Sequence, residues 1–116
     1  MRLELPWPPT ANTMFPQGKD GKRHLSKRGR SYRIEVYARV CEQTKRLKTL
    51  RGPLSVSVEL YPPDDRKRDI DNAFKALFDS LQFSAVFRDD SQIKELTAKM
   101  HPKVKGGKVM VHIKEI

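Results

Sequence analysis

Two carboxylates and a basic side chain stand close together in the middle of the sequence. Asp69 and Asp71 are two residues apart, and Lys75 follows four residues after Asp71. Aspartate oxygens are ligands that a hard divalent cation accepts, and a nearby lysine can offset negative charge on a phosphate. This stretch therefore contains the residue types for a metal site that acts on an anionic substrate.

Apolar spacing predicts a helix that would hold these groups in place. On a helix that begins near Ile70, the apolar arc contains Ile70, Ala73, Phe74, Leu77, Phe78 and Leu81. The opposite arc contains Asp71, Asn72, Lys75 and Asp79. Asp69 precedes this pattern and is expected to cap the helix. From spacing alone, an exposed ladder of ion pairs through Asp71, Lys75 and Asp79 is an equally good interpretation.

The charge of the chain favours a polyanionic partner. Its 24 Lys and Arg residues outnumber its 14 Asp and Glu residues, which gives a net charge of +10. Residues 17–51 hold 12 of the basic residues and 3 of the acids, whereas residues 64–90 hold 7 acids and 5 basic residues. A carboxylate-rich patch thus lies inside a cationic protein, as expected for a nucleic-acid enzyme that uses a metal.

The composition also excludes several classes of protein. The single cysteine, Cys41, permits neither an internal disulfide nor a thiolate zinc site. No stretch approaches the roughly 20 apolar residues of a membrane span, and the N-terminus lacks the apolar core of a signal peptide. We therefore expect a cytoplasmic protein with no membrane partner.

Alternating and turn-forming residues predict four strands. Arg2 to Leu5 alternates before a proline-rich run, and residues 54–61 alternate over eight positions. Residues 93–100 form a third expected strand. A Lys-Gly-Gly-Lys turn at 105–108 then predicts a closing hairpin with a strand that contains Val109, Val111 and Ile113.

The first half of the chain supplies most of the basic residues. Residues 10–25 show no sustained periodicity and predict a long basic loop. Ser26 is expected to cap a helix that follows it. The expected core stripe of this helix contains Ile34, Tyr37, Cys41, Thr44 and Leu47, with Ala38 and Val40 beside it.

These elements predict a single α+β domain over residues 1–116, with α/β-like character. One mixed sheet of about four strands would pack with two helices in the order β-α-β-α-β-β. The two acidic positions at Asp89 and Asp90 fall in the loop before the third strand, from which a third carboxylate could reach the site.

At these residues the chain resembles the RusA-type Holliday junction resolvases, which are small dimeric endonucleases of prophage origin. The resemblance rests on Leu5-Pro6-Trp7-Pro8-Pro9, on Arg68-Asp69-Ile70-Asp71-Asn72 with Lys75 and Asp79, and on Asp89-Asp90 with Gly106-Gly107. It implies that Asp69, Asp71 and Asp90 are catalytic, metal-binding carboxylates and that Lys75 is an essential basic residue.

Three aspartates with phosphate oxygens would suit Mg²⁺, with Mn²⁺ as a substitute. The expected enzyme is a homodimeric endonuclease that nicks two strands of a four-way DNA junction symmetrically, in recombination and repair. A non-catalytic nucleic-acid-binding protein and a nuclease for flaps or other branched DNA are the alternatives. The basic residues expected to contact DNA are Lys19, Lys22, Arg23, Lys27, Arg28, Arg30, Arg66, Lys67, Arg68 and Lys105.

Overall fold

A single mixed sheet of four strands forms the centre of the fold. Strands β1 (Arg2–Leu5), β2 (Leu54–Tyr61), β3 (Ile93–Met100) and β4 (Lys108–Glu115) lie in the order β1-β4-β2-β3. β4 is antiparallel to both β1 and β2, whereas β2 and β3 are parallel. The structure, a computed structural model, describes residues 1–45 and 48–116. It confirms the predicted α+β class and the mixed sheet.

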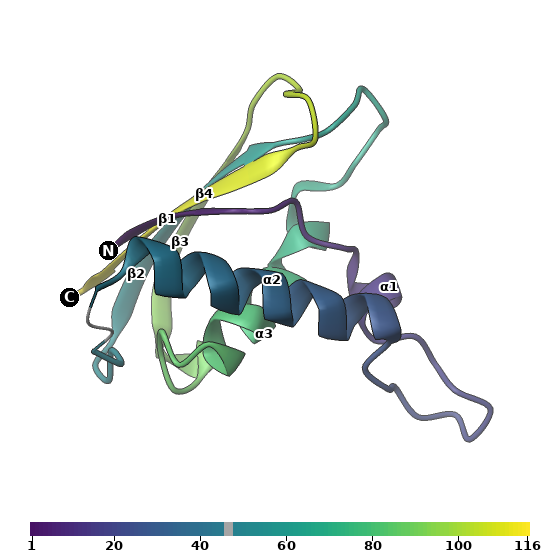
Figure 1. Cartoon of the computed structure of the whole chain (residues 1–116), viewed down its shortest axis with the longest axis horizontal. Coiled ribbons are helices and arrows are strands. Elements are labelled where there is room, and N and C mark those ends of the chain that lie inside the picture. The colour runs from purple at the N-terminus through teal and green to yellow at the C-terminus, as the bar shows by residue number, and fades with distance from the viewer. Residues whose placement is uncertain (46–47) are drawn as a thin grey trace.

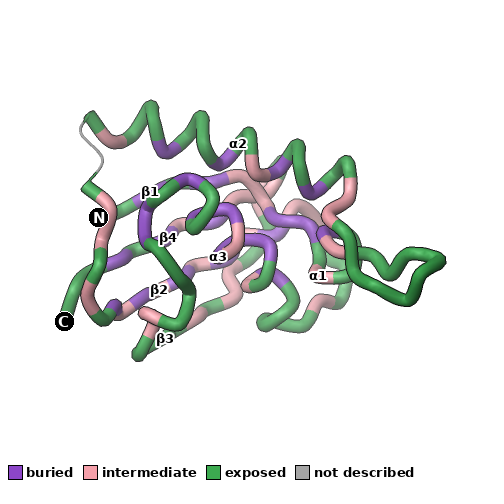
Figure 2. The backbone as a smooth tube through the Cα atoms, turned by 90° about the horizontal axis from the view of Figure 1, so that it is seen from below, coloured by how far each residue is buried: buried purple, intermediate pink, exposed green. Residues whose placement is uncertain are grey.

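Alternation along the strands determines which face of the sheet is covered. Every second residue of β2 is buried, and β4 contributes Val109, Val111 and Ile113 to the same core. Two helices, α2 (Lys27–Gln43) and α3 (Phe74–Phe83), pack against each other and close this core (Figure 1). The buried residues of strands and helices accordingly lie between the layers, and exposed residues lie outside them (Figure 2).

The predicted closing hairpin between the last two strands is wrong. The turn itself is present, with Gly106 and Gly107 at φ values of 81° and 69°. However, β2 lies between β3 and β4, because the connection from β3 to β4 crosses the end of β2. In this connection the N–H groups of His101 and Val104 donate to the carbonyls of Leu60 and Pro62. Turn chemistry specifies a local change of direction and not the strand that the chain then pairs with.

The core face of α2 also differs from the prediction. Ser26 caps the helix as expected, since its side chain accepts the N–H of Gly29. The buried side is formed by Gly29, Tyr32, Val36 and Val40, while Ile34 and Tyr37 are 65% and 53% exposed. Cys41 and Ala38 are exposed and Thr44 is half-buried. Leu47 lies outside the described residues.

The α2 helix carries two stripes at helical spacing, and tertiary contacts select one. The Tyr32 hydroxyl donates to the Pro6 carbonyl at 2.8 Å, and a side chain at Gly29 would meet the Met14 carbonyl at 2.9 Å. These contacts turn the Tyr32 side inward.

No helix in the described part of the chain is long and apolar enough to cross a membrane.

Residues 10–25 are more ordered than the predicted loop. Thr10 caps a one-turn helix, α1 (Ala11–Met14), and a small hairpin follows in which Gln17 pairs with Arg23. Gly21 makes its turn with φ of 79°. In Figure 1 this hairpin projects from the body of the molecule beyond α1. Its exposed residues include Lys19 and Lys22.

Candidate active site

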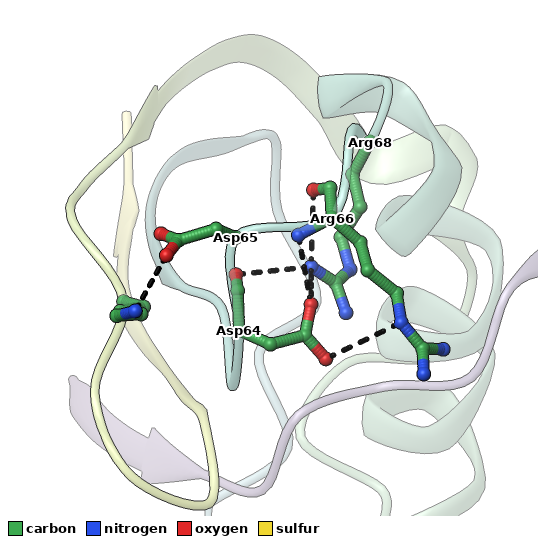
Figure 3. A network of polar contacts seen from close by, with 5 residues as sticks. Asp64, Asp65, Arg66 and Arg68 are labelled. Carbon is green, nitrogen blue, oxygen red and sulfur yellow. Dashed lines mark hydrogen bonds and ion pairs between the residues drawn. The ribbon is translucent and has the colours of Figure 1, made fainter.

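A network of ion pairs fixes the loop that leads from β2 to the acidic segment. The Asp64 carboxylate accepts the N–H of Arg66 at 2.9 Å and pairs with Arg68 at 2.8 Å (Figure 3). The Arg68 guanidinium lowers the pKa of Asp64 to about 2. Asp65 pairs with Lys103 from the connection between β3 and β4. The loop is thereby tied both to itself and to the connection between β3 and β4.

Arg68 also anchors the loop to the proline-rich segment that follows β1. Its guanidinium lies 5.5 Å from the centre of the Trp7 ring, in cation–π geometry. The same group donates to the carbonyls of Asp64 and Arg66 at 3.3 Å. Asp69 directly follows Arg68 in the chain, so the contacts of the Arg68 guanidinium with Trp7, Asp64 and Arg66 also fix the backbone at Asp69.

Asp69 and Asp71 lie around a tight turn before α3. Asp69 is extended, with φ of −80° and ψ of 134°, and the following residues form the 3₁₀ turn η1 (Ile70–Ala73). The predicted helix therefore begins later than expected. The tighter 3₁₀ winding places Ile70 outside the apolar stripe, and it is 40% exposed. Ala73, Leu77, Phe78 and Leu81 are buried as predicted.

The side chain of Asp69 does not cap this turn, contrary to the prediction. Its backbone carbonyl accepts the N–H of Asn72 at 3.2 Å, while its carboxylate makes no capping hydrogen bond. Asp69 and Asp71 are both exposed. Both carboxylates are consequently free to face a ligand.

The other predicted catalytic residue of this segment, Lys75, is the second residue of α3. Its ammonium group lies 5.4 Å from the centre of the Phe15 ring, beside a groove of about 520 Å³ that Arg23 and Asp79 also line. No ion pair joins Lys75 to Asp71 or Asp79 in the structure as described. The ion-pair ladder that spacing alone allowed is therefore absent.

Asp79 instead joins α3 to α2. Its two carboxylate oxygens accept from Nε and Nη2 of Arg33 at 2.8 and 3.0 Å. The two side chains are 19% and 24% exposed. Nothing in the sequence distinguished Arg33 from the other arginines of this helix, and its structural role was missed. Asp79 is a support and not a free ligand.

Asp89 is likewise engaged, at the start of the short helix η2 (Asp90–Gln92). It forms a capping box with Gln92, and the N–H of Ser91 donates to its carboxylate at 2.8 Å, which lowers the pKa of Asp89. The N–H of Asp90 donates to the side chain of Gln82 at 3.2 Å. Asp90 thus follows a fixed turn beside the last turn of α3, and it is exposed.

Seven acids lie between residues 64 and 90, and they divide into two groups. Asp64, Asp65 and Asp79 have basic partners, and Asp89 caps a helix. The remaining three form no ion pair with any described residue: they are Asp69, Asp71 and Asp90. The carboxylates with neither a basic partner nor a capping role are the three predicted to hold a metal.

Within one protomer, however, these three carboxylates are not together. Asp71 precedes the ten-residue helix α3, which spans about 15 Å, and Asp90 lies by its last turn. Similarly, Asp69 shares a pocket with Met100 at the end of β3, whereas Asp90 precedes the start of that strand. Across the described residues, no three Asp, Glu, His or Cys side chains form a group that could hold a metal ion.

The donor chemistry suits a hard cation although the set is incomplete in one chain. Asp69 and Asp71 offer carboxylate oxygens near each other in sequence, on an exposed turn, without a competing protein cation. Asp90 is equally available but stands at the opposite end of α3. A single protomer thus presents two parts of the predicted site and not the whole.

The predicted DNA-contacting residues fall into three groups. A groove of about 560 Å³ beside Asp69 is lined by Arg28, Arg66, Lys67 and Arg68, together with Asn72. Arg23 lines the second groove with Lys75. The other five are exposed but line neither groove: they are Lys19 and Lys22 in the hairpin, Lys27 and Arg30 on α2, and Lys105 in the turn before β4.

Comparison with known proteins agrees with the sequence resemblance. A family model described as endodeoxyribonuclease RusA matches residues 6–114. The crossover junction endodeoxyribonucleases RusA of Escherichia coli strain K12 and of Enterobacteria phage 82 are each 34% identical to this chain over 114 residues, covering 98% of the chain and 93% of the relative. The Shigella sonnei protein of the same name is 33% identical over the same length. The phage relative agrees with the expected prophage origin.

Proposed function

The chain belongs to the RusA family of endodeoxyribonucleases, and from this premise we propose that it is a Mg²⁺-dependent resolvase that nicks two strands of a four-way DNA junction symmetrically. It is an enzyme that hydrolyses DNA, and its relatives are named for crossover junctions. The observation that carries the proposal is the set of three exposed carboxylates that have no basic partner among the described residues. One of them, Asp69, lines a basic groove in a protein of net charge +10.

Each part of the proposed site has its own task. The groove lined by Arg28, Arg66, Lys67 and Arg68 would hold the phosphate backbone. Asp69 and Asp71 would hold the ion. Asp90 is the third proposed ligand, although within one chain α3 separates it from the other two. When bound, Mg²⁺ supplies an activated water and neutralises charge on the scissile phosphate, and Mn²⁺ suits the same oxygen ligands.

Lys75 would act directly on the phosphate. Its ammonium group lies over the Phe15 ring and has no acidic partner in the described structure, so its charge is available to an anion. Negative charge increases on the non-bridging oxygens as water attacks the phosphorus, and a fixed cation stabilises that charge. We assign Lys75 this role.

The proposed symmetric nicking requires two active sites, which supports a dimeric enzyme. A four-way junction has two-fold symmetry, and one chain carries one set of candidate carboxylates. Two protomers would therefore make the two incisions, one each. The proposed place of action is the cytoplasm, in the recombination and repair of DNA.

The test compares three synthetic substrates: a four-way junction, a flap and a linear duplex, each with and without Mg²⁺. We expect Mg²⁺-dependent paired nicks in the junction. Binding without metal-dependent cleavage would identify a non-catalytic binding protein, and cleavage of flaps alone would identify a flap nuclease.

Asp71→Asn tests the site in the same assay, because it removes a charge at nearly constant shape. We expect junction binding to persist and nicking to be lost. Glu42→Gln, an exposed acid on α2, is the matched control and should nick normally. Normal nicking by Asp71→Asn would refute the site assignment.

A further inference from the structure

The hairpin that follows α1 lies almost wholly in solvent. All of residues 16–24, which we call the basic hairpin, are exposed, and none of them belongs to the hydrophobic core. The basic hairpin projects beyond α1 in both views of the backbone (Figure 1, Figure 2). Because it buries no large apolar side chain, its order is better explained by contact with a partner than by packing within the domain.

Hydrogen bonds give the basic hairpin a defined shape before a partner binds. The N–H of Gly18 donates to the Lys22 carbonyl at 2.8 Å, and the Asp20 side chain accepts the N–H of Lys22 at 2.9 Å. Asp20 also pairs with His24 at 3.0 Å. A ribbon that already has its bound shape loses little conformational entropy when it binds.

The charge of the basic hairpin suits a polyanion. Lys19 and Lys22 are exposed, and neither forms an ion pair with any described residue. The one acid of the hairpin, Asp20, already has His24 as its partner. Two ammonium groups are therefore available to phosphate groups.

The base of the basic hairpin is fixed to α1. Nη1 of Arg23 donates to the Asn12 side chain at 3.2 Å and to the Phe15 carbonyl at 3.3 Å. The hydroxyl of Ser26, which caps α2, donates to the Thr13 carbonyl at 2.6 Å. These bonds set the direction in which the hairpin leaves the body of the protein.

The one-turn helix α1 separates two basic grooves. Thr13 lines the groove beside Asp69. Asn12, the residue before it, lines the groove that contains Lys75 and Arg23. Successive residues of a helical turn point to different sides, so the two grooves lie on different sides of α1. Since Arg23 belongs to the basic hairpin, the hairpin begins at the wall of the second groove.

We propose that the basic hairpin enters the major groove of a second arm of the junction, next to the arm that lies in the groove beside Asp69. The major groove of B-DNA is about 12 Å wide and admits a two-stranded ribbon. Five extended residues span about 16 Å, so one side of the hairpin is long enough to cross it. Lys19 and Lys22 then contact phosphates at the groove edges.

This inference rests on the proposed function and adds to it an element that selects the substrate. A linear duplex has no second arm, so it can occupy the groove beside Asp69 without reaching the basic hairpin. A four-way junction occupies both. The hairpin thereby favours branched DNA over duplex DNA.

Binding measured without Mg²⁺ tests the hairpin separately from nicking. In the double variant Lys19→Ala/Lys22→Ala, affinity for a four-way junction should fall roughly tenfold, while affinity for a linear duplex should stay within about twofold. The slope of log junction affinity against log salt should fall by about 1.8, because each lost phosphate contact removes about 0.9. Equal losses of affinity for junction and duplex would overturn the proposal.

The matched control removes the same charge elsewhere. Lys99 on β3 and Lys114 on β4 are exposed and line neither groove. The double variant Lys99→Ala/Lys114→Ala should therefore bind the junction as the wild type does. A loss as large as that of Lys19→Ala/Lys22→Ala would reduce the effect to net charge and overturn the proposal.

A shortened hairpin gives a readout that does not depend on charge. Replacing residues 18–22 with an Asn-Gly turn keeps the pairing of Gln17 with Arg23. The midpoint of urea denaturation should not change, because the replaced residues lie outside the core. Guanine N7 lies in the major groove, so its methylation in the second arm should weaken junction binding by the wild type but not by the shortened variant. The same interference in both proteins, or none in either, would overturn the proposal.

The inference and the proposed function fail in different ways. A wild-type protein that shows the hairpin-dependent junction binding but never nicks the junction would refute the proposed function alone. Junction preference and paired nicking that both survive shortening of the hairpin would overturn this inference alone.

Discussion

The Arg33–Asp79 pair between α2 and α3 offers a quantitative test of the fold. Both hydrogen bonds are short, at 2.8 and 3.0 Å, and about four-fifths of each side chain is buried. Replacing Asp79 with Asn leaves the Arg33 guanidinium without its counter-charge in this partly dry position. Because both helices contribute to the core, loss of the pair should weaken the whole domain.

The expected cost lies between two limits. An exposed ion pair contributes about 0.2–1 kcal/mol, and breaking a fully buried pair costs about 3–5 kcal/mol. With side chains about one-fifth exposed, we expect Asp79→Asn to lower the free energy of unfolding by about 2 kcal/mol. For a chain of 116 residues this corresponds to a fall in Tm of roughly 6–10 °C.

The assay is urea denaturation of the wild type, Asp79→Asn, Arg33→Gln and the double variant, all at one protein concentration. The double-mutant cycle should give a coupling energy of about 1–2 kcal/mol. The Arg39–Glu42 pair is the control, because its side chains are 55% and 62% exposed and its coupling should stay below about 0.5 kcal/mol. Equal coupling in the two pairs would refute the reasoning.

Three further predictions follow from single contacts. Tyr32→Phe leaves the Pro6 carbonyl without its donor and should destabilise the fold by about 1–2 kcal/mol in urea denaturation; an unchanged midpoint would contradict this. The pKa of Asp64 is lowered from its ordinary value of 3.8, so its pairing with Arg68 stabilises the fold at pH values above 3.8, and this stabilisation is lost as the pH falls towards about 2. Asp64→Asn should therefore flatten the profile of unfolding free energy against pH between pH 4 and 2. A profile parallel to that of the wild type would contradict this prediction. Lys67→Ala should reduce the slope of log affinity for junction DNA against log salt by about 0.9, whereas Lys114→Ala, on β4, should leave it unchanged; equal slopes in both variants would exclude a contact by Lys67.

Local periodicity correctly predicted the elements whose buried face follows from the spacing of their own residues. The alternation over β2 and the apolar stripe from Ala73 to Leu81 were confirmed because each has one buried face and one less buried face. Ser26 was recognised because capping depends on residues within one turn. These signals need no knowledge of the rest of the chain.

The failed predictions concern pairing between distant segments. α2 has two apolar stripes, and the buried one is selected by Pro6 and Met14, which no local pattern connects with it. The position of β4 between β1 and β2 depends on how the connection crosses β2. For the same reason spacing identified the three candidate carboxylates but could not show that α3 separates Asp90 from Asp69 and Asp71.

The central position of β4 has a consequence for folding during synthesis. Strand β1 pairs with β4 alone, so residues 2–5 find their sheet partner only after residues 109–112 have been made. At about 5–20 residues per second, β1 remains without β4 for roughly 5–20 s and β2 for roughly 3–10 s. The fold cannot be assembled progressively from its first strand, and a chain shortened before β4 would expose the edges of both strands to aggregation.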